Sequence, residues 1–470
     1  MRLSNYFFNK DRQKLKFFVC GMPRGGTSLT GELLNGHKDI YCYFGETGIL
    51  PLLEMIAGDN KIPKDNVEKI KDWIINSLTD NLISKIDDIG FQKDISSYKR
   101  VLTEVGYKET LGYEKFSMKE VESICNNILD LLYQGYYGSD LIQAGIEIVN
   151  KCLCSKTDRE IIGEKNPDNL RFLKYFSSNN IKVISLLREP LSTIDSMRKR
   201  STRSEEVWDK AFSPSFNNSL AQYYRYLKYI FSSLSSLHSG KLCIIKYEDL
   251  LSYKLERTSN LYEFLGVSPC KKGLEFVDKL VHENNKSAIM HYSDEEILIL
   301  KLLIGKELSY LGYDNSFYEN YNLKLNKIEL NFENNIVFPL EGVYLEGKEL
   351  LQDSWMDKTA TFYSLIKKQC KKIIFTLLFN FIDMLTSGNI VTLSIYQDTF
   401  LIDKINLNGL HNEHEIEINI DNIIKWDFNY QFYFFTFKLI SSFSVKPIAV
   451  KGLGLDIREL SFFIKSVKFI

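Results

Sequence analysis

The sequence lacks a large net charge, a repeated cysteine pair and a long hydrophobic run. Its 59 basic and 60 acidic residues among 470 give a net charge of −1, so no overall field attracts the chain to nucleic acid or to an anionic membrane. The eight cysteines are scattered, mostly within apolar runs, which indicates buried, reduced thiols. Any phosphate recognition must therefore come from local anion sites.

The chain also lacks the features of a secreted or membrane-spanning protein. Its first residues, MRLSNYFFNKD, contain no hydrophobic stretch long enough for a signal peptide. The most apolar segment, residues 373–385, is interrupted by Asn380 and Asp383 and is shorter than the roughly 20 residues needed to span a bilayer. We therefore expect no transmembrane segment and a cytoplasmic location.

The sequence also lacks the lysine that is typical of a phosphate-binding P-loop. Residues 19–28, VCGMPRGGTS, fit the spacing of a phosphate-binding P-loop, but Thr27 occupies the lysine position. That lysine contacts the outer phosphates of ATP or GTP, whereas the glycine-rich backbone and helix start hold the inner ones. The loop, which contains Arg24, predicts a ligand with a 5′-phosphate and a different outer group. A simple strand-to-helix turn is the alternative.

Five short apolar runs predict strands, at residues 16–20, 40–44, 159–165, 181–187 and 241–246. Strand-helix-strand units of this length are parallel and right-handed. Ligands of such sheets bind beyond the carboxyl ends of the strands. We therefore expect the P-loop and the residues that follow the other strands to meet at one edge.

A second anion site is predicted after the run at residues 181–187. If Pro190 opens a helix, Ser196 and Arg200 lie four apart on one face, and Arg188 precedes the helix. The alternative is structural, with Arg188 in an ion pair and residues 198–200 forming a solvated basic turn.

Residues 23–28, PRGGTS, resemble the 5′-phosphosulfate loop of the sulfotransferase superfamily, whose donor is 3′-phosphoadenosine 5′-phosphosulfate (PAPS). Residues 188–200 resemble its 3′-phosphate motif. Residues 45–47 (GET), residues 165–167 (KNP) and the additional Arg200 are similar to the branch that contains tyrosylprotein sulfotransferases and many bacterial enzymes. The likeness covers about residues 15–315, and Gly25 stands where the family often has serine.

The resemblance implies roles for individual residues. It assigns Glu46 as the general base, with Lys165 and Arg24 offsetting the charge on the transferred group. It places the donor, and its product 3′,5′-adenosine bisphosphate (PAP), on Arg24, Gly25, Gly26, Thr27, Ser28, Arg188, Ser196 and Arg200. Tyr247 is a candidate to pack on the adenine ring, or else a core tyrosine.

Two further groups of histidines are candidates for other roles, one as the general base and one as metal ligands. His37 is a rival base, although histidines in connecting loops are usually structural. His411 and His414 lie in a segment that alternates like a strand with one solvated face, so we predict no metal site.

The fold class expected is α/β, with a P-loop-type parallel sheet flanked by helices and a C-terminal all-β sandwich or jelly roll. We assign residues 1–318 to the sulfotransferase domain, with a helical insertion at about residues 51–150, and residues 319–470 to an accessory domain. Alternating runs at residues 327–332, 391–396, 415–420 and 430–437 predict its strands. Within the insertion, Ser117 and Glu120 form a capping box, and the aromatic residues at 133–137 are either a sugar platform or core.

The sequence therefore predicts a PAPS-dependent sulfotransferase acting on an acceptor hydroxyl or amine. The C-terminal residues resemble accessory β-domains of bacterial enzymes of surface-polysaccharide synthesis, which favours a bacterial glycan or glycolipid as the acceptor. The alternatives are a protein-tyrosine sulfotransferase, a P-loop kinase, and a non-catalytic nucleotide-binding protein.

Overall fold

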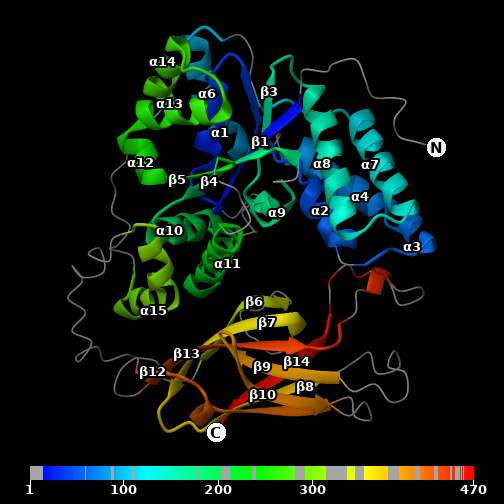
Figure 1. Cartoon of the computed structure of the whole chain (residues 1–470), viewed down its shortest axis with the longest axis vertical. Coiled ribbons are helices and arrows are strands. Elements are labelled where there is room, and N and C mark those ends of the chain that lie inside the picture. The colour runs from blue at the N-terminus through cyan, green and yellow to red at the C-terminus, as the bar shows by residue number, and fades with distance from the viewer. Residues whose placement is uncertain are drawn as a thin grey trace. The chain divides into compact units, whose positions relative to one another are not determined.

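The structure is a computed structural model that divides into two compact units. One comprises Met1–Ser215 with Tyr226–His291, and the other Phe216–Arg225 with Tyr292–Ile470, and each contains its own sheet (Figure 1). The predicted domain boundary at residue 319 lies outside the described residues. The structure describes residues 14–58, 60–85, 89–107, 112–176, 179–202, 212–234, 240–280, 292–313, 336–344, 354–378, 391–407, 413–427, 432–444, 447–449, 456, 458 and 460–470.

The first unit is built on a five-stranded sheet in the order β2-β3-β1-β4-β5. All four adjacent pairs of strands are parallel, which confirms the predicted fold class for this part. The strands are β1 (Lys14–Gly21), β2 (Ile40–Tyr43), β3 (Ile161–Lys165), β4 (Lys182–Leu187) and β5 (Leu242–Lys246).

Helices cover both faces of this sheet because the side chains of its strands alternate between two apolar layers. Phe17 and Val19 of β1 pack in one core with residues of α1, α13 and α14. Phe18 points to the other face and stacks on Phe176 of α9, with ring centroids 4.3 Å apart. The helices of this unit outside the insertion are α1 (Thr27–Asn35), α9 (Leu173–Phe176), α10 (Pro190–Ser201), α12 (Tyr247–Ser252), α13 (Lys254–Leu265) and α14 (Lys271–Leu280), with the 3-10 helix η3 (Pro167–Phe172) before α9. Helix α11 (Phe216–Leu234) is divided, with residues 216–225 in the second unit and the rest in the first.

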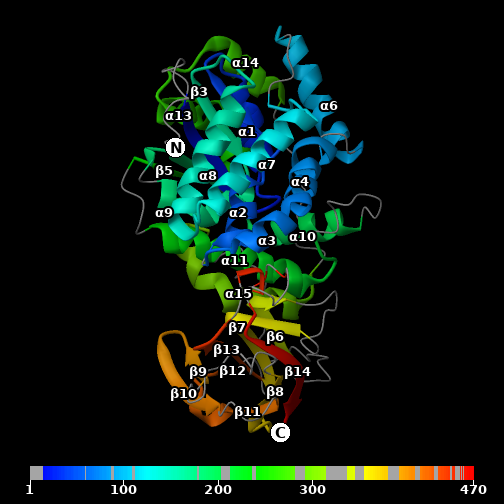
Figure 2. The same ribbon diagram turned by 90° about the vertical axis from the view of Figure 1, so that its right-hand side faces the viewer.

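The chain between β2 and β3 is helical, and Figure 2 brings its α7 and α8 toward the viewer. Ser117 and Glu120 form the predicted capping box at the start of α7, with Glu120 N donating to Ser117 Oγ at 3.4 Å. A short π-helical turn, η2, follows α4. The elements are α2 (Ile49–Ala57), α3 (Lys64–Lys69), α4 (Lys71–Thr79), η2 (Asp80–Ser84), α6 (Ile89–Glu104), α7 (Met118–Tyr133) and α8 (Gly138–Cys154).

The second unit contains an antiparallel sheet whose main order is β10-β9-β13-β7-β14-β8-β11. In addition, β6 pairs with β7 and β12 pairs with β13. Strands near the two ends of this order, β9 and β11, contribute to one apolar core, so the sheet curls around that core. The elements are α15 (Asp294–Tyr310), β6 (Ile336–Tyr344), β7 (Ser354–Lys367), β8 (Lys372–Leu378), β9 (Val391–Gln397), β10 (Phe400–Leu407), β11 (Glu413–Asn419), η8 (Ile420–Asn422), β12 (Trp426–Asp427), β13 (Phe432–Ser441), η9 (Pro447–Ala449) and β14 (Phe462–Phe469).

This second sheet confirms the expected all-β part near the C-terminus. The runs predicted at residues 391–396, 415–420 and 430–437 correspond to β9, β11 and β13. The run predicted at residues 327–332 lies outside the description. Among the residues described, no helix has the length and apolar character needed to cross a membrane.

Candidate active site

Four of the predicted site segments lie at the carboxyl edge of the parallel sheet. The P-loop follows β1, Glu46 follows β2, Lys165 ends β3, and Arg188 follows β4. Tyr247, the fifth, begins α12 directly after β5. Because all five strands are parallel, their carboxyl ends form one edge, as the sequence predicted.

The backbone of the P-loop forms a cradle that depends on its glycines. Gly25 N donates to Met22 O at 2.9 Å, and both Arg24, with φ of 64°, and Gly26, with φ of 98°, are left-handed. A Cβ atom on Gly25 would lie 2.7 Å from Met22 O, and one on Gly26 would lie 2.3 Å from the ring of Tyr247. A side chain at either glycine would therefore require its neighbours to shift, and this includes a serine at the position of Gly25.

The first turn of α1 faces this cradle with groups suited to an anion. Thr27 is buried and Ser28 is exposed, the first turn holds no acidic residue, and Gly26 is the N-cap. A helix N-terminus carries a partial positive charge and presents backbone N–H groups. The arrangement suits a phosphate group.

The two predicted anion motifs meet in space. Arg24 Nε donates to Ser196 Oγ at 3.1 Å, and Arg188 donates to the carbonyl oxygen of Arg24 at 2.9 Å. The guanidinium of Arg188 also lies 4.6 Å from the centroid of the Tyr247 ring. Tyr247 therefore lies between Arg188 and the P-loop glycine Gly26, rather than deep in the core.

Pro190 opens α10, as predicted, and Glu189 caps it. The Glu189 carboxylate accepts hydrogen bonds from Leu191 N at 2.9 Å and Ser192 N at 2.6 Å. Burial raises the pKa of Glu189, whereas these N–H groups oppose the rise. Arg200, one turn after Ser196, is buried, so the interpretation of residues 198–200 as a solvated basic turn is wrong for this arginine.

Glu46 lies between two lysines. One carboxylate oxygen, Oε1, accepts from Lys165 Nζ, and the other, Oε2, accepts from Lys85 Nζ. The side chains of Lys165 and Lys85 are only 5% and 14% exposed. Burial, the largest single effect, raises the pKa of Glu46, but the charges and hydrogen bonds of the two lysines together outweigh it and lower this pKa to about 2. Glu46 is therefore a carboxylate at neutral pH.

The loop that carries Glu46 is fixed from two sides. Glu46 is left-handed, with φ of 63°, and Gly48, with φ of 67°, is the N-cap of α2. A Cβ atom on Gly48 would lie 2.5 Å from the side chain of Asn81 in η2. The π-helical turn thus packs against the loop and brings Lys85, the next residue after η2, to Glu46.

Beneath this loop lies a fully buried carboxylate, Glu164 of β3. Its Oε1 accepts from Thr47 N at 2.5 Å, and its Oε2 accepts from Asn169 Nδ2 at 3.1 Å. Burial raises the pKa of Glu164 to about 7, with hydrogen bonds from Thr47 and Asn169 opposing the rise and the charge of Glu46 adding to it. Glu164 ties the residue after Glu46 to the sheet.

The rival base lies elsewhere. His37 follows α1, and since α1 leads from the carboxyl end of β1 back to the start of β2, His37 lies at the opposite edge of the sheet. It is buried, its Nδ1 accepts from Asp39 N at 3.2 Å, and its Nε2 lies 3.0 Å from Ser268 O. Both ring nitrogens thus contact backbone groups, as a structural histidine would.

No group of three or more His, Cys, Asp or Glu side chains in the described ranges is placed to hold a metal ion. His414 lies on β11, opposite Leu377 of β8, as the predicted strand requires. His411 lies outside the described residues.

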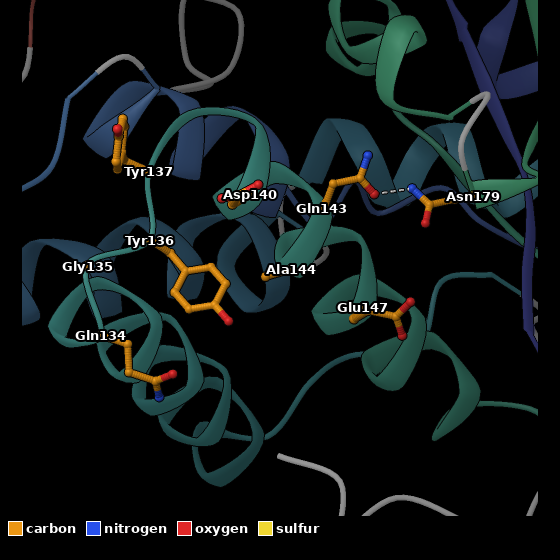
Figure 3. A pocket seen from close by; sticks show the side chains of 9 residues that line it. All are labelled: Gln134, Gly135, Tyr136, Tyr137, Asp140, Gln143, Ala144, Glu147 and Asn179. Carbon is orange, nitrogen blue, oxygen red and sulfur yellow. Dashed lines mark hydrogen bonds between the residues drawn. The ribbon is translucent and has the colours of Figure 1, made fainter. Parts of the chain in front are cut away.

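Two of the aromatic residues predicted at 133–137, Tyr136 and Tyr137, line a pocket of about 600 Å³ at the turn between α7 and α8. In Figure 3 the Tyr136 side chain projects from this turn into the space between the two helices, and Tyr137 lines the pocket from the start of α8. Tyr137 is 49% exposed, so the core-packing interpretation is wrong for this residue. Asn179 donates to Gln143 and to Tyr175 O, the latter at 3.0 Å. The lining residues are Gln134, Gly135, Tyr136, Tyr137, Asp140, Gln143, Ala144, Glu147 and Asn179.

Sequence reasoning missed two residues of the site, Lys85 and Glu164. Nothing in the sequence around Lys85 distinguishes it from other lysines of the helical segment. Glu164 carries a detectable signal, because a carboxylate that follows apolar residues within a strand must find hydrogen-bond partners when buried.

Comparison with known proteins identifies the family of this chain. A family model described as "Sulfotransferase family" matches residues 16–270. The chain belongs to the sulfotransferase family. The matched residues include every predicted site residue from Arg24 to Tyr247, and the membership makes the protein a sulfotransferase enzyme.

Individual relatives share less than a third of their aligned residues with this chain. Carbohydrate sulfotransferase 1 of Danio rerio is 29% identical over 316 residues, which cover 61% of this chain and 70% of that protein. Among solved structures, the sulfotransferase domain of the Synechococcus PCC 7002 olefin synthase is 16% identical with a TM-score of 0.35, covering 66% of this chain and 98% of that one. The sulfotransferase domain from the curacin biosynthetic pathway is 19% identical with a TM-score of 0.37, covering 64% and 99%.

Proposed function

We propose that this sulfotransferase uses PAPS as its donor and a hydroxyl or amine of a glycan or glycolipid as its acceptor. The observation that supports the donor best is the contact between two separate anion motifs. Arg24 of the P-loop bonds Ser196 of α10, and Arg188 bonds the backbone of Arg24. A ligand with phosphates at its 5′ and 3′ positions requires two anion sites side by side.

The residues of the edge fit such a donor. The left-handed turn at Arg24 and Gly26 opens the backbone at the start of α1, which suits the 5′-phosphosulfate, together with Gly25, Thr27 and Ser28. Arg188, Ser196 and Arg200 would hold the 3′-phosphate. Tyr247, next to Arg188, would contact the adenine ring.

When bound, PAPS supplies an activated sulfuryl group and leaves as PAP. Lys165 and Arg24 offset the negative charge on the transferred group, and charges fixed in advance are the strongest form of such stabilisation. Glu46 removes the proton from the acceptor hydroxyl onto a carboxylate oxygen. Glu46 and Lys165 are already in contact, so the base and the cation lie at the same place.

A carbohydrate acceptor is supported by two observations. The curated relative described above is a carbohydrate sulfotransferase. The pocket at the turn between α7 and α8 combines tyrosine rings, amides and carboxylates, which are the groups that bind sugars through stacking and hydrogen bonds. We propose that part of a glycan acceptor lies there.

The alternatives make different predictions. A P-loop kinase would need a cation to contact the outer phosphates, and Thr27 occupies that lysine position. A non-catalytic nucleotide-binding protein would keep its function when Glu46 is replaced. A protein-tyrosine sulfotransferase would share the donor site and differ only in the acceptor that it turns over.

Calorimetric titration tests the donor directly. Wild-type protein should bind PAP tightly, and 5′-AMP and ATP much more weakly, because only PAP carries the 3′-phosphate. Turnover is then assayed with PAPS and a panel of glycans and tyrosine peptides. Preference for ATP, or no binding of any of the three nucleotides, would refute the proposed donor.

A further inference from the structure

The carboxylate assigned as the base has a partner that the family motifs do not include. Lys85 comes from the helical segment between β2 and β3, directly after η2, and its Nζ donates to Glu46 Oε2. Lys165 comes from the sheet and donates to Oε1. The two lysines thus approach the carboxylate from different elements and occupy different oxygens.

These two lysines differ in what else they can contact. Lys165 is paired in the sheet with Val19 of β1, and its Cβ lies 3.6 Å from the position that a Cβ on Gly31 of α1 would take. It therefore stands beside the helix whose N-terminus forms the anion cradle. Lys85 follows η2, which packs on the loop of Glu46 and Gly48.

A donor anion at the cradle changes the balance around Glu46. It competes with Glu46 for Lys165 and adds a negative charge nearby, and both effects favour protonation of a buried carboxylate. Among the described residues, the other titratable groups that face Glu46 are Glu164 of β3 and Tyr43 of β2, and neither supplies a positive charge. Lys85 is then the cation that keeps Glu46 ionised.

We propose that Lys85 is a positioning residue that holds Glu46 as an oriented carboxylate when Lys165 turns to the donor. This proposal rests on the assignment of Glu46 as the base. The expected consequence lies in the pH dependence of kcat, because kcat reports the ionisation of groups in the bound complex.

The first experiment compares pH profiles of kcat between pH 5 and 8. Wild-type enzyme and Lys85→Arg should show no fall toward pH 5, since a cation still faces Glu46. Lys85→Met should lose activity on the acid side with a midpoint above pH 5, since burial is left to raise the pKa of Glu46. Lys69→Met, at an exposed position on α3, is the matched control and should keep the wild-type profile.

A second readout needs neither donor nor activity. The midpoints of urea unfolding are measured for Lys85→Met, Glu46→Gln and the double variant. If the ion pair is formed, the changes in the free energy of unfolding caused by the two substitutions are non-additive, because the first substitution has already broken the pair. Lys69→Met combined with Glu46→Gln should be additive.

The outcomes separate this proposal from the proposed function. If wild-type protein fails to bind PAP, the donor assignment is wrong. If PAP binds and turnover is normal but the Lys85→Met profile matches that of the wild type, only the role of Lys85 is overturned. Additive effects in the unfolding cycle overturn it as well. If Lys85→Met fails to fold, Lys85→Gln replaces it in both experiments.

Discussion

Arg24 Nε donates a hydrogen bond to Ser196 Oγ at 3.1 Å, across 172 positions of the sequence. The bond joins the P-loop after β1 to the middle of α10 after β4, two neighbouring strands of the sheet. Arg188 completes the link through the carbonyl oxygen of Arg24. These two bonds join the predicted 5′-phosphosulfate loop to the predicted 3′-phosphate motif.

Ser196→Ala and Arg188→Ala should both weaken PAP binding. Loss of the serine hydroxyl should cost about fivefold in affinity, and loss of the arginine at least about tenfold, because hydrogen bonds to charged groups are the stronger ones. Arg188→Ala should also affect 5′-AMP, since this arginine holds the Arg24 carbonyl. Calorimetric titration of each variant with PAP and 5′-AMP checks both expectations.

Arg198→Ala is the matched control for this pair. Arg198 lies on the same helix but donates to Pro214 O at 3.0 Å, so PAP affinity should stay close to that of the wild type. If Ser196→Ala lowers the affinity for 5′-AMP as much as that for PAP, α10 does not contact the 3′-phosphate.

The sheet and its edge could be predicted because their signals are local. Apolar runs end at glycine, proline or charged residues, and parallel connection then places Glu46, Lys165 and Arg188 on one edge. The capping box of Ser117 and Glu120 is similarly contained in four residues.

Features that depend on tertiary packing could not be predicted in this way. Lys85 reaches Glu46 only because η2 packs on the loop at Gly48, and no local pattern records that contact. Arg24 and Glu46 take left-handed conformations that sequence preferences disfavour for such residues. Strained backbone of this kind concentrates at functional sites, where the surrounding structure imposes it.

Glu46→Gln should lower kcat by at least about 100-fold, because the amide cannot take up the acceptor proton. Its affinity for PAP should be equal to or higher than that of the wild type, since Lys165 loses a competing negative charge. Single-turnover assays and PAP titration measure the two effects separately. Loss of PAP binding in this variant would instead place Glu46 in the donor site and contradict its assignment as the base.

Tyr136→Ala should raise KM for a glycan acceptor by about threefold to tenfold, because the Tyr136 ring lines the pocket between α7 and α8. PAP affinity should not change. Tyr253→Ala, which removes a tyrosine that is 55% exposed, is the matched control. An unchanged KM in Tyr136→Ala would remove this pocket from the proposed acceptor site.

Glu164→Gln should abolish one part of the pH dependence of stability. Burial raises the folded-state pKa of Glu164 to about 7 from an ordinary value of 4.5. Below pH 4.5 the carboxyl is protonated in both the folded and the unfolded state. Above pH 7 it is ionised in both, and the folded state is destabilised because it buries the charged carboxylate. The wild-type free energy of unfolding should therefore decrease between pH 4.5 and 7, by about 3 kcal/mol from this residue.

The variant keeps the hydrogen bonds that the neutral carboxyl makes. Asn169 Oδ1 is buried without a hydrogen-bond partner among the described residues, so a rotated Asn169 amide would accept from the new glutamine and the Thr47 N–H would keep its acceptor. Glu46 does not affect this comparison. Because its pKa is lowered to about 2, its stabilising contribution to the free energy of unfolding is fully present above pH 4.5. That contribution is lost only as the pH falls toward 2. Urea unfolding of wild type and Glu164→Gln across pH 4.5 to 8 measures the difference. Parallel curves would mean that Glu164 is ionised in the folded protein throughout this range, held so by the Thr47 and Asn169 donors.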